Sequence, residues 1–312
     1  MDINAAPLLE VDGLWVRFGR TRGRFAQGQL EAIRDLSLTV RAGEIVAVVG
    51  ASGAGKSLLA QAVMGLLPTG ATMGGALRYK GQPLTPKRQR QLRGREMALV
   101  PQAITWLDPL MRVGPQVRGG DNRPQQAERQ RAVFARLGLA PQTERLYPFQ
   151  LSGGMARRVL LSTAVIGTAQ LLIADEPTPG MAPGQAAEAL GILRQLAHDG
   201  RGVLLITHDL ELAVRFAGSI VVFYAGTTVE EALAADFAAG PAALRHPYSQ
   251  ALWRALPQNG FEATAGSQPH AGTPLPGCLY APRCPLMTAA CTQQNPPLRA
   301  LRGGMVRCIH AT

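Results

Sequence analysis

The sequence predicts an α/β protein built on a mainly parallel β-sheet that is covered by helices. Three short apolar runs, residues 171–174, 203–207 and 220–224, have the length and composition of strands buried on both faces. A helical pattern over residues 185–197 separates the first two runs. Alternation of strand and helix along a chain is typical of a parallel sheet with helices on its faces.

A glycine-rich loop follows an earlier apolar run, residues 45–49, and precedes a helical pattern. Its chemistry resides in six residues: Gly50, Ser52, Gly53, Gly55, Lys56 and Ser57. Glycines let the backbone curl so that successive N–H groups converge on phosphate oxygens, and the following helix points its positive dipole end there. Lys56 can then reach the β- and γ-phosphates of a nucleotide, and the Ser57 hydroxyl can coordinate Mg²⁺. The alternative is a turn that only connects two elements, but every fixed position of the motif is filled.

Two carboxylates, Asp175 and Glu176, follow the apolar run 171–174. Ligands of parallel sheets bind at the carboxyl ends of strands, so we expect Asp175 to hold Mg²⁺, directly or through water. Glu176 is then placed to polarise an attacking water. Taken alone, such a pair is better explained as a solvated strand end.

A third anion-binding pattern, residues 151–155 (LSGGM), lies between these two elements. It places the Ser152 side chain and the backbone N–H groups of Gly153 and Gly154 at the start of a helical pattern. With these three motifs in this order, the chain resembles the ATP-binding cassette (ABC) ATPases over essentially its whole length. The resemblance implies a head-to-tail dimer in which each ATP lies between one subunit's phosphate-binding loop and the other's 151–155 signature.

The resemblance also implies roles for residues that follow other predicted strands. Gln102 corresponds to the Q-loop residue that contacts Mg²⁺ and the membrane subunit, and His208 to the switch histidine that contacts the γ-phosphate. Phe18 resembles the aromatic residue that stacks on adenine, with Trp15 as a neighbouring candidate. Ordinary sheet packing is the alternative for both aromatic residues.

One motif departs from the family pattern. Residues 179–182 read PGMA, where the family usually has a D-loop that ends in Leu-Asp. The aspartate that helps to couple the two ATP sites is therefore absent, which puts the symmetry of hydrolysis in question. We still expect ATPase activity, because Lys56, Glu176 and His208 are present.

Composition is that of a globular protein, with 46% hydrophobic and 17% charged residues. No stretch reaches the roughly 18 consecutive apolar residues of a spanning helix, and the start lacks a secretory pattern. We therefore expect a cytosolic protein, or one attached to a membrane only through a partner.

The net charge of +11 suggests binding to nucleic acid, and the basic residues within 87–95 are its best support. No aromatic residue interleaves with those charges, so a solvated basic face beside an anionic membrane surface is the better interpretation.

We expect a nucleotide-binding domain over residues 1–228, with a helical subdomain at about 82–168. A linker region with glycine and proline punctuation is expected over 229–277, followed by a cysteine-rich unit over 278–312. That unit holds all four cysteines of the chain: Cys278, Cys284, Cys291 and Cys308. Clustered thiols in a cytosolic protein suit a metal or cluster site better than disulfides. Four ordinary buried cysteines are the alternative, and the spacing lacks the paired CxxC knuckles of zinc ribbons.

Residues 246–252, 276–278 and 281–285 resemble the terminal extension of the oligopeptide, dipeptide and nickel importer ATPases. That resemblance implies an iron–sulfur cluster, of 4Fe-4S type, on the four cysteines, with zinc as the alternative metal. A structural role for the cluster is preferred to electron transfer, because so short a segment does not fold alone.

We therefore expect the ATP-hydrolysing subunit of an ABC importer, using ATP and Mg²⁺ to energise uptake of peptides or of nickel and metal chelates. The implied partners are two transmembrane permease subunits, a second and different ATPase, and an extracytoplasmic substrate-binding protein, with no nucleic acid. The implied location is the cytoplasmic face of the cell membrane, as a peripheral subunit. The alternative is a soluble ABC ATPase that acts on nucleic acid or ribosomes. A small-molecule kinase ranks last, because the 151–155 signature has no role in one.

Overall fold

The parallel strands of the core all end at the same edge of the sheet, and the functional motifs follow those strand ends. The computed structural model describes residues 6–22, 26–270, 273 and 275–312. Within them, five neighbouring strands run parallel to one another. In spatial order they are β6 (Met97–Val100), β7 (Leu171–Asp175), β8 (Gly202–Thr207), β3 (Ile45–Val49) and β9 (Ser219–Tyr224).

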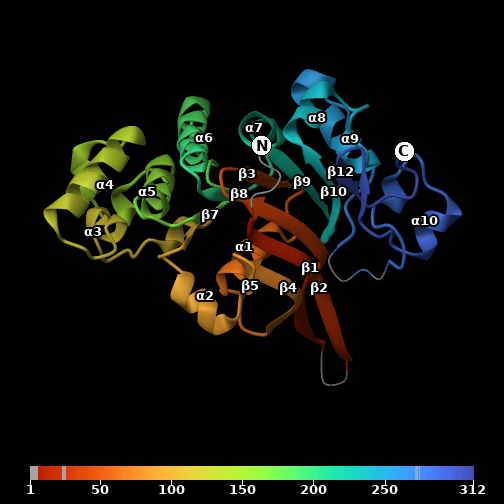
Figure 1. The fold of residues 1–312 in the computed structure, drawn as a ribbon, viewed down its shortest axis with the longest axis horizontal. Helices are drawn as coiled ribbons and strands as arrows, with labels where there is room; N and C mark the ends of the chain where they lie inside the picture. The colour runs from red at the N-terminus through yellow and green to blue at the C-terminus, as the bar shows by residue number, and fades with distance from the viewer. Residues whose placement is uncertain (1–5, 23–25, 271–272, 274) are drawn as a thin grey trace.

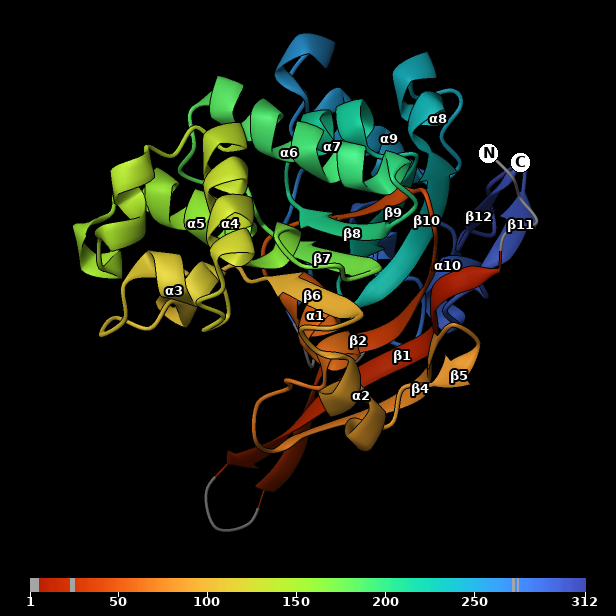
Figure 2. The ribbon, with the colours of Figure 1, turned by 60° about the vertical axis from the view of Figure 1, so that its left-hand side comes forward.

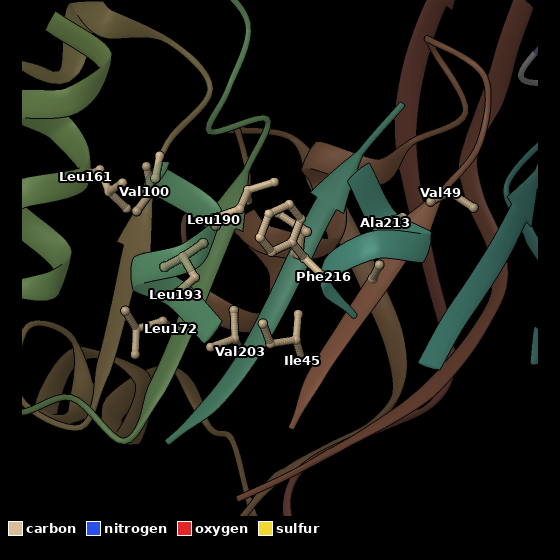
Figure 3. Close-up of a cluster of buried hydrophobic side chains, with 14 of the residues drawn as sticks. Ile45, Val49, Val100, Leu161, Leu172, Leu190, Leu193, Val203, Ala213 and Phe216 are labelled. Carbon is tan, nitrogen blue, oxygen red and sulfur yellow. The ribbon is translucent and has the colours of Figure 1, made fainter. Parts of the chain in front are cut away.

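Alternate residues of these strands face two different cores, which explains why the apolar runs are continuous. On β3, Ile45 faces one hydrophobic cluster and the next residue, Val46, faces the other. Figure 3 shows the first cluster, in which Leu193 and Phe216 from the covering helices pack over Ile45 and Val203. Strands that are buried on both faces cannot alternate apolar with polar residues.

Helices cover both faces of the parallel core (Figure 2). On one side lie α6 (Pro183–His198) and α7 (Leu210–Phe216), and α6 contains the helix expected over 185–197. On the other side lie α1 (Lys56–Met64) and α2 (Pro86–Leu92). The phosphate-binding loop connects β3 to α1, as the sequence predicts.

An antiparallel layer continues the sheet beyond β9. Its first strand is β10 (Thr227–Leu233), which pairs antiparallel with β9 and forms one bridge with β2. The remaining strands, in the spatial order β5-β4-β1-β2, are β1 (Pro7–Arg22), β2 (Ala26–Arg41), β4 (Ala71–Tyr79) and β5 (Gln82–Pro83). This layer carries Trp15 and Phe18 on β1.

A helical layer forms one end of the molecule (Figure 1). It consists of α3 (Val113–Val117), α4 (Pro124–Arg136), α5 (Gly153–Val165), and the 3₁₀ turns η1 (Ile104–Trp106), η2 (Pro141–Arg145) and η3 (Pro148–Gln150). We expected this layer to begin at about residue 82. Residues 82–92 instead form β5 and α2, and residues 97–100 form β6, the strand predicted before Gln102, which pairs with β7 in the buried sheet. The helical layer therefore begins about twenty residues later than expected.

The cysteine-rich unit is part of the same sheet and is not a separate domain connected by an irregular linker. The range 229–277, expected as a linker region, contains most of β10 together with α8 (Ala234–Ala239), α9 (Pro247–Arg254) and η4 (Pro257–Asn259). Further along, β12 (Gly304–Val306) pairs with β10 and with β11 (Arg299–Leu301). The unit, which also includes η5 (Ala281–Arg283) and α10 (Ala289–Gln293), lies at the end of the molecule opposite the helical layer (Figure 1).

Two buried arginines fasten this terminal unit to the cassette. The Arg245 guanidinium donates to the Glu230 and Asp236 carboxylates and to two carbonyls of the terminal hairpin. The Arg307 guanidinium binds Asp35 at 2.7 Å and a carbonyl of β10 at 2.9 Å. Buried charges of this kind hold their partners firmly, because removal of one member leaves the other desolvated and unpaired.

His246 begins α9 as its N-cap and is 1% exposed. Its Nδ1 accepts a hydrogen bond from the Tyr248 backbone N–H at 3.0 Å. Burial lowers the pKa of His246 to about 3, because the imidazolium would be desolvated. The folded protein therefore holds this side chain in its neutral form at all pH values above that pKa.

We predict that this histidine makes the protein less stable in mild acid. Below pH 6.5 the unfolded chain binds a proton that the folded chain excludes, so the free energy of unfolding falls, by about 2 kcal/mol at pH 5. His246→Asn keeps a capping acceptor and removes the titrating group. Urea denaturation at pH 7.5 and pH 5 should show a smaller loss for His246→Asn than for wild type. Equal losses in the two proteins would contradict the assignment.

Candidate functional site

The phosphate-binding loop has a backbone that only glycine permits at two positions. A Cβ on Gly50 would lie 2.1 Å from the carbonyl oxygen of Phe223, and one on Gly55 would lie 2.6 Å from that of Ala32. Gly55 also has φ = +99°, in the left-handed region. The Lys56 ammonium donates to the carbonyls of Gly50 and Ala51 at 2.7 and 3.0 Å. The loop is therefore closed around its own lysine, ready to present N–H groups to an anion.

Three oxygen-bearing side chains from separate strand ends meet beside this loop. The Ser57 hydroxyl lies 3.1 Å from Asp175 Oδ1 and 3.4 Å from Gln102 Oε1. They come from the start of α1, the end of β7 and the segment after β6. A hydroxyl, a carboxylate and an amide oxygen are a suitable donor set for Mg²⁺, which takes oxygen ligands and keeps several waters. The structure thus brings together the three residues that the sequence assigned to this ion.

Burial also sets the charge of this group. It raises the pKa of Asp175 to about 6, and the hydrogen bond from Ser57 opposes this shift. The nearby Glu176 carboxylate raises the pKa of Asp175 further, whereas Lys56 and Arg157 lower it. Burial lowers the pKa of Lys56, against the attraction of both carboxylates. Desolvation therefore disfavours the charged forms of both Asp175 and Lys56, and a divalent cation bound here would stabilise the ionised carboxylate.

Glu176 is held against His208. The histidine Nδ1 lies 2.9 and 2.8 Å from the two carboxylate oxygens of Glu176, whose side chain is buried while that of His208 is 62% exposed. Glu176 has φ = +49°, and its backbone N–H donates to Ile206 on β8. The strained backbone aims the carboxylate at the strand edge beside Asp175. A carboxylate so placed can orient and deprotonate a water.

The signature residues occupy a different surface. Ser152 caps α5, with its hydroxyl accepting the Met155 N–H at 3.3 Å, and Gly153 and Gly154 form the first turn. Ser152 and Gly153 are exposed. Among the described residues, no hydrogen bond joins this turn to the phosphate-binding loop of the same chain. That separation fits the prediction that the signature serves the ATP of a second subunit.

The two candidate adenine-stacking residues differ in their packing. The Trp15 ring lies under the Arg17 guanidinium at 4.6 Å and so close to Gly74 that a Cβ there would lie 2.3 Å away. Phe18 is half-buried and packs at the margin of the second core cluster. Trp15 is therefore engaged in sheet packing, and Phe18 is the residue that stays a candidate for adenine.

One residue of this region was missed from the sequence. Arg157, on α5, donates to the backbone carbonyls of Gln102 and Glu176. The only signal for it was a basic residue one turn into the helix that follows the signature, and nothing in the pattern indicated which way it faced. Its place between two predicted site residues emerges from the tertiary packing alone.

The four cysteines surround one small cavity. Cys278, Cys284, Cys291 and Cys308 line it together with His246, Tyr280 and His310. All four thiols are free, and burial raises the pKa of Cys278 and of Cys284. His310 Nε2 lies 3.3 Å from the Cys291 sulfur. Among the described residues, no group of three or more His, Cys, Asp or Glu side chains is arranged so that it could hold a metal ion. The donor set and its convergence fit a thiolate-bound metal or cluster, whereas the side-chain positions are not those of a formed site.

Comparison with known proteins settles the family. The family model described as ABC transporter matches residues 33–179, and that described as Oligopeptide/dipeptide transporter, C-terminal region, matches residues 229–291. The dipeptide transport ATP-binding protein DppD of Escherichia coli K12 is 37% identical over 322 residues, which cover 97% of this chain and 96% of that protein. This chain belongs to the ABC transporter ATPases, in their oligopeptide/dipeptide branch.

Further relatives and solved structures agree with this membership. The oligopeptide transport ATP-binding protein OppD of Salmonella typhimurium is 34% identical, covering 96% of this chain and 92% of that protein. A solved ATP-binding subunit of an ABC transporter matches 74% of this chain and 91% of its own, with a TM-score of 0.60 and 26% identity. The fold also matches the ATP-binding cassette MJ0796 bound to ADP and phosphate, with a TM-score of 0.63 and 22% identity over 72% of this chain and 98% of that one.

As an ABC ATPase, the protein binds and hydrolyses ATP with Mg²⁺. The expected P-loop fold of ABC type is confirmed. The relatives named above are transport proteins, so they do not favour the alternative of an ATPase that acts on nucleic acid or ribosomes. The roles of individual residues remain predictions that rest on the geometry.

We predict that Glu176→Gln lowers the rate of ATP hydrolysis by a factor of about a hundred or more, because general-base contributions are of that size. ATP affinity should be retained, since the phosphate-binding loop and Ser57 are untouched. Phosphate release and binding of a fluorescent ATP analogue provide the two measurements. Asp199→Asn, an exposed carboxylate at the end of α6, is the matched control and should behave as wild type. Hydrolysis at the wild-type rate by Glu176→Gln would exclude Glu176 as the base.

Proposed function

We propose that this ABC ATPase energises import of peptides through partner permease subunits. The observation that carries the proposal is an exposed apolar surface on the helical layer that begins two residues after Gln102, the predicted Mg²⁺ ligand. Similarity to the named dipeptide and oligopeptide transport proteins over nearly the whole chain supports peptides as the cargo. Nickel or metal chelates are the alternative cargo, because an ATPase subunit does not itself contact what is transported.

The apolar surface, called here the docking surface, begins two residues after Gln102. It comprises the exposed side chains of Ile104, Trp106, Leu110, Met111 and Phe149. Trp106 is 54%, Leu110 is 87% and Phe149 is 75% exposed. An aromatic anchor among exposed aliphatic side chains is typical of a protein-binding surface. We assign it to the cytoplasmic surface of a permease subunit.

Internal contacts hold the docking surface in one piece. The Gln116 side-chain amide exchanges hydrogen bonds with the Asp108 backbone at 2.9 Å and donates to the Met111 carbonyl at 2.7 Å. Tyr147 stacks on Phe149 with ring centroids 5.6 Å apart. A displacement of Gln102 caused by Mg²⁺ and ATP would therefore reach a segment whose backbone is held by side-chain hydrogen bonds, and not a loose loop.

We propose that the chain works in a head-to-tail dimer with a second, different ABC ATPase. The exposed signature turn supports a partner's ATP as its ligand. Residues 179–182 form a turn, closed by a hydrogen bond from the Met181 N–H to Thr178, and contain no carboxylate. The Gly180 carbonyl lies so near Gly154 that a Cβ there would be 3.1 Å away. Two ATP sites that differ in this segment would hydrolyse ATP at unequal rates.

The location follows from these partners. Among the residues that the structure describes, no helix is long and apolar enough to cross a bilayer. We propose a peripheral subunit at the cytoplasmic face of the cell membrane, held there by two permease subunits, with an extracytoplasmic binding protein delivering the cargo. The docking surface supplies the apolar contact that such attachment requires.

We further propose that the four cysteines hold an iron–sulfur cluster of 4Fe-4S type. Thiolates are the ligands of such clusters, and all four line one cavity. When bound, the cluster would crosslink the loops of the terminal unit. The residues of this chain supply the surrounding apolar wall, with Tyr280 and Ala281 excluding water from the sulfurs. Zinc is the alternative metal.

Identification of what co-purifies with the tagged chain tests the transporter assignment. The chain would be extracted gently from membranes without oxygen. Two multi-span permeases and a second ATPase should be recovered with it. Recovery with ribosomes or nucleic acid, and with no membrane protein, would overturn the assignment and leave the ATP site intact. The binding protein encoded beside these partners would then be tested with peptides, nickel and metal chelates, which separates the cargo alternatives.

We predict that Trp106→Ala weakens attachment to the permease about thirtyfold, because loss of an interface aromatic anchor costs at least about 2 kcal/mol. ATP binding by the isolated chain should not change. Phe261→Ala is the matched control, since Phe261 is 72% exposed but lies outside the docking surface. Titration of permease capture against salt and detergent gives the measurement. Equal capture of the two variants would remove the docking surface from the interface.

We predict that anaerobically purified protein contains iron and acid-labile sulfide in equal amounts. Cys291→Ser should lose both, because a buried thiolate ligand is replaced by a hydroxyl. Met287→Ser, an exposed neighbouring sulfur side chain, should retain both. Metal analysis and the visible absorption of the cluster provide the readouts. Zinc without sulfide would establish the alternative metal. Absence of both iron and zinc would mean that the four cysteines are ordinary core residues.

A further inference from the structure

Arg157 lies where the pairing of β7 with β6, the last strand of the sheet order, stops. The β6–β7 ladder runs in register as far as Val100 opposite Ala174. Two residues beyond that pair lie Gln102, in the segment after β6, and Glu176, directly after β7. The backbone N–H of Glu176 turns away and donates to Ile206 on β8.

Beyond the end of the β6–β7 ladder, the Arg157 guanidinium connects the two backbones by hydrogen bonds. Its Nη1 donates both to the Gln102 carbonyl and to the Glu176 carbonyl, the latter at 3.3 Å. These two acceptors belong to the residues predicted to contact Mg²⁺ and to activate water. Burial lowers the pKa of Arg157, and the Glu176 and Asp175 carboxylates oppose that shift. One side chain from the helical layer thus bridges the main chains of two separate site residues.

Arg157 belongs to the same helix as the signature residues, so the bridge connects the signature to the ATP site of its own subunit. It stands one turn into α5, whose N-cap is Ser152 of the signature. Ser152 is exposed on the surface predicted to meet a partner's ATP, whereas the Arg157 guanidinium points inward to the carbonyls of Gln102 and Glu176. A short helical segment therefore joins the two nucleotide contacts of this chain. The D-loop segment, residues 179–182, contains no carboxylate to connect them.

We propose that Arg157 is a positioning residue that couples the two ATP sites of the dimer. It fixes the separation of Gln102 and Glu176 and transmits displacement of the signature helix to both. The proposal rests on the head-to-tail dimer proposed above. The side-chain oxygen of Gln102 lies 3.4 Å from Ser57, and the Glu176 carboxylate lies 2.8 Å from His208. Loss of the bridge would let both backbones shift, so metal ligation and water activation would both suffer.

The test compares Arg157→Ala with wild type in the complex recovered from membranes, where both ATPases are present. The maximal rate of ATP hydrolysis should fall about tenfold, the size expected for loss of a hydrogen bond to a charged donor. The Mg²⁺ concentration for half-maximal rate should rise. The Hill coefficient for ATP should fall toward about 1, because the coupling free energy between sites is lost. KM for ATP should change little, since the phosphate-binding loop is not altered.

Two further variants separate positioning from stability. Arg157→Lys keeps the charge and one point donor, so it should recover part of the rate and of the cooperativity. Arg131→Ala removes a guanidinium from an exposed ion pair on α4 in the same helical layer and should match wild type in every readout. If Arg157→Ala does not fold, Arg157→Gln, with a neutral donor, takes its place in the comparison.

Two results with the Arg157 variants would overturn the coupling role. Wild-type Mg²⁺ dependence and Hill coefficient in an Arg157 variant with a lowered melting temperature would show a merely structural role. Glu176→Gln in the same complex distinguishes this failure from failure of the site itself. If Glu176→Gln abolishes hydrolysis while the Arg157 variants behave as wild type, the ATPase site stands and the coupling role of Arg157 falls.

Discussion

The structure depends on one constraint: the parallel strands of the core end at a common edge. The hydrogen bond from Ser57 to Asp175, at 3.1 Å, is its clearest expression, because it joins residues 118 positions apart in the sequence. Parallel strands need long crossovers, and those crossovers are the helices that bury both faces of the sheet. Only a sheet buried in this way keeps its carboxyl edge rigid enough to place a hydroxyl, a carboxylate and an amide around one small ion.

At the other end of the molecule, the terminal unit is likewise held by a small number of buried hydrogen bonds between residues distant in the sequence. Glu230 is completely buried on β10, where its carboxylate accepts hydrogen bonds from the backbone N–H groups of Arg245 and His246. That single carboxylate orients both the arginine that binds the terminal hairpin and the histidine that starts α9. A segment with few apolar residues is thus fixed by buried charge and by strand pairing. The pairing of β12 with β10 makes it an extension of the cassette sheet.

A cluster of tyrosines lies between the thiol cavity and the phosphate-binding loop. The Tyr248 ring centroid is 4.5 Å from that of Tyr224 and 5.3 Å from that of Tyr280, which lines the cavity. Burial raises the pKa of Tyr248, and the backbone N–H of Ala51 in the phosphate-binding loop opposes this shift. The terminal unit is therefore packed against the base of the ATP site through aromatic side chains, while the helices α3 and α4 lie at the far end of the molecule (Figure 1).

The sequence by itself determined the features that depend on local order along the chain. The phosphate-binding loop, the Asp175–Glu176 strand end, α6 and the parallel strands are all local patterns, because glycine placement and apolar periodicity act within a few residues. The meeting of Ser57 and Asp175 also followed, since strands of one parallel sheet share an edge, whereas the place of Gln102 beside them was implied by the family resemblance. Tertiary structure alone decided three matters. Residues 82–92 formed β5 and α2 on the sheet side, the expected linker folded around buried Glu230 and Arg245, and Arg157 turned inward to bridge Gln102 and Glu176. Each of these depends on which distant groups need a partner once they are buried, and no local pattern carries that information.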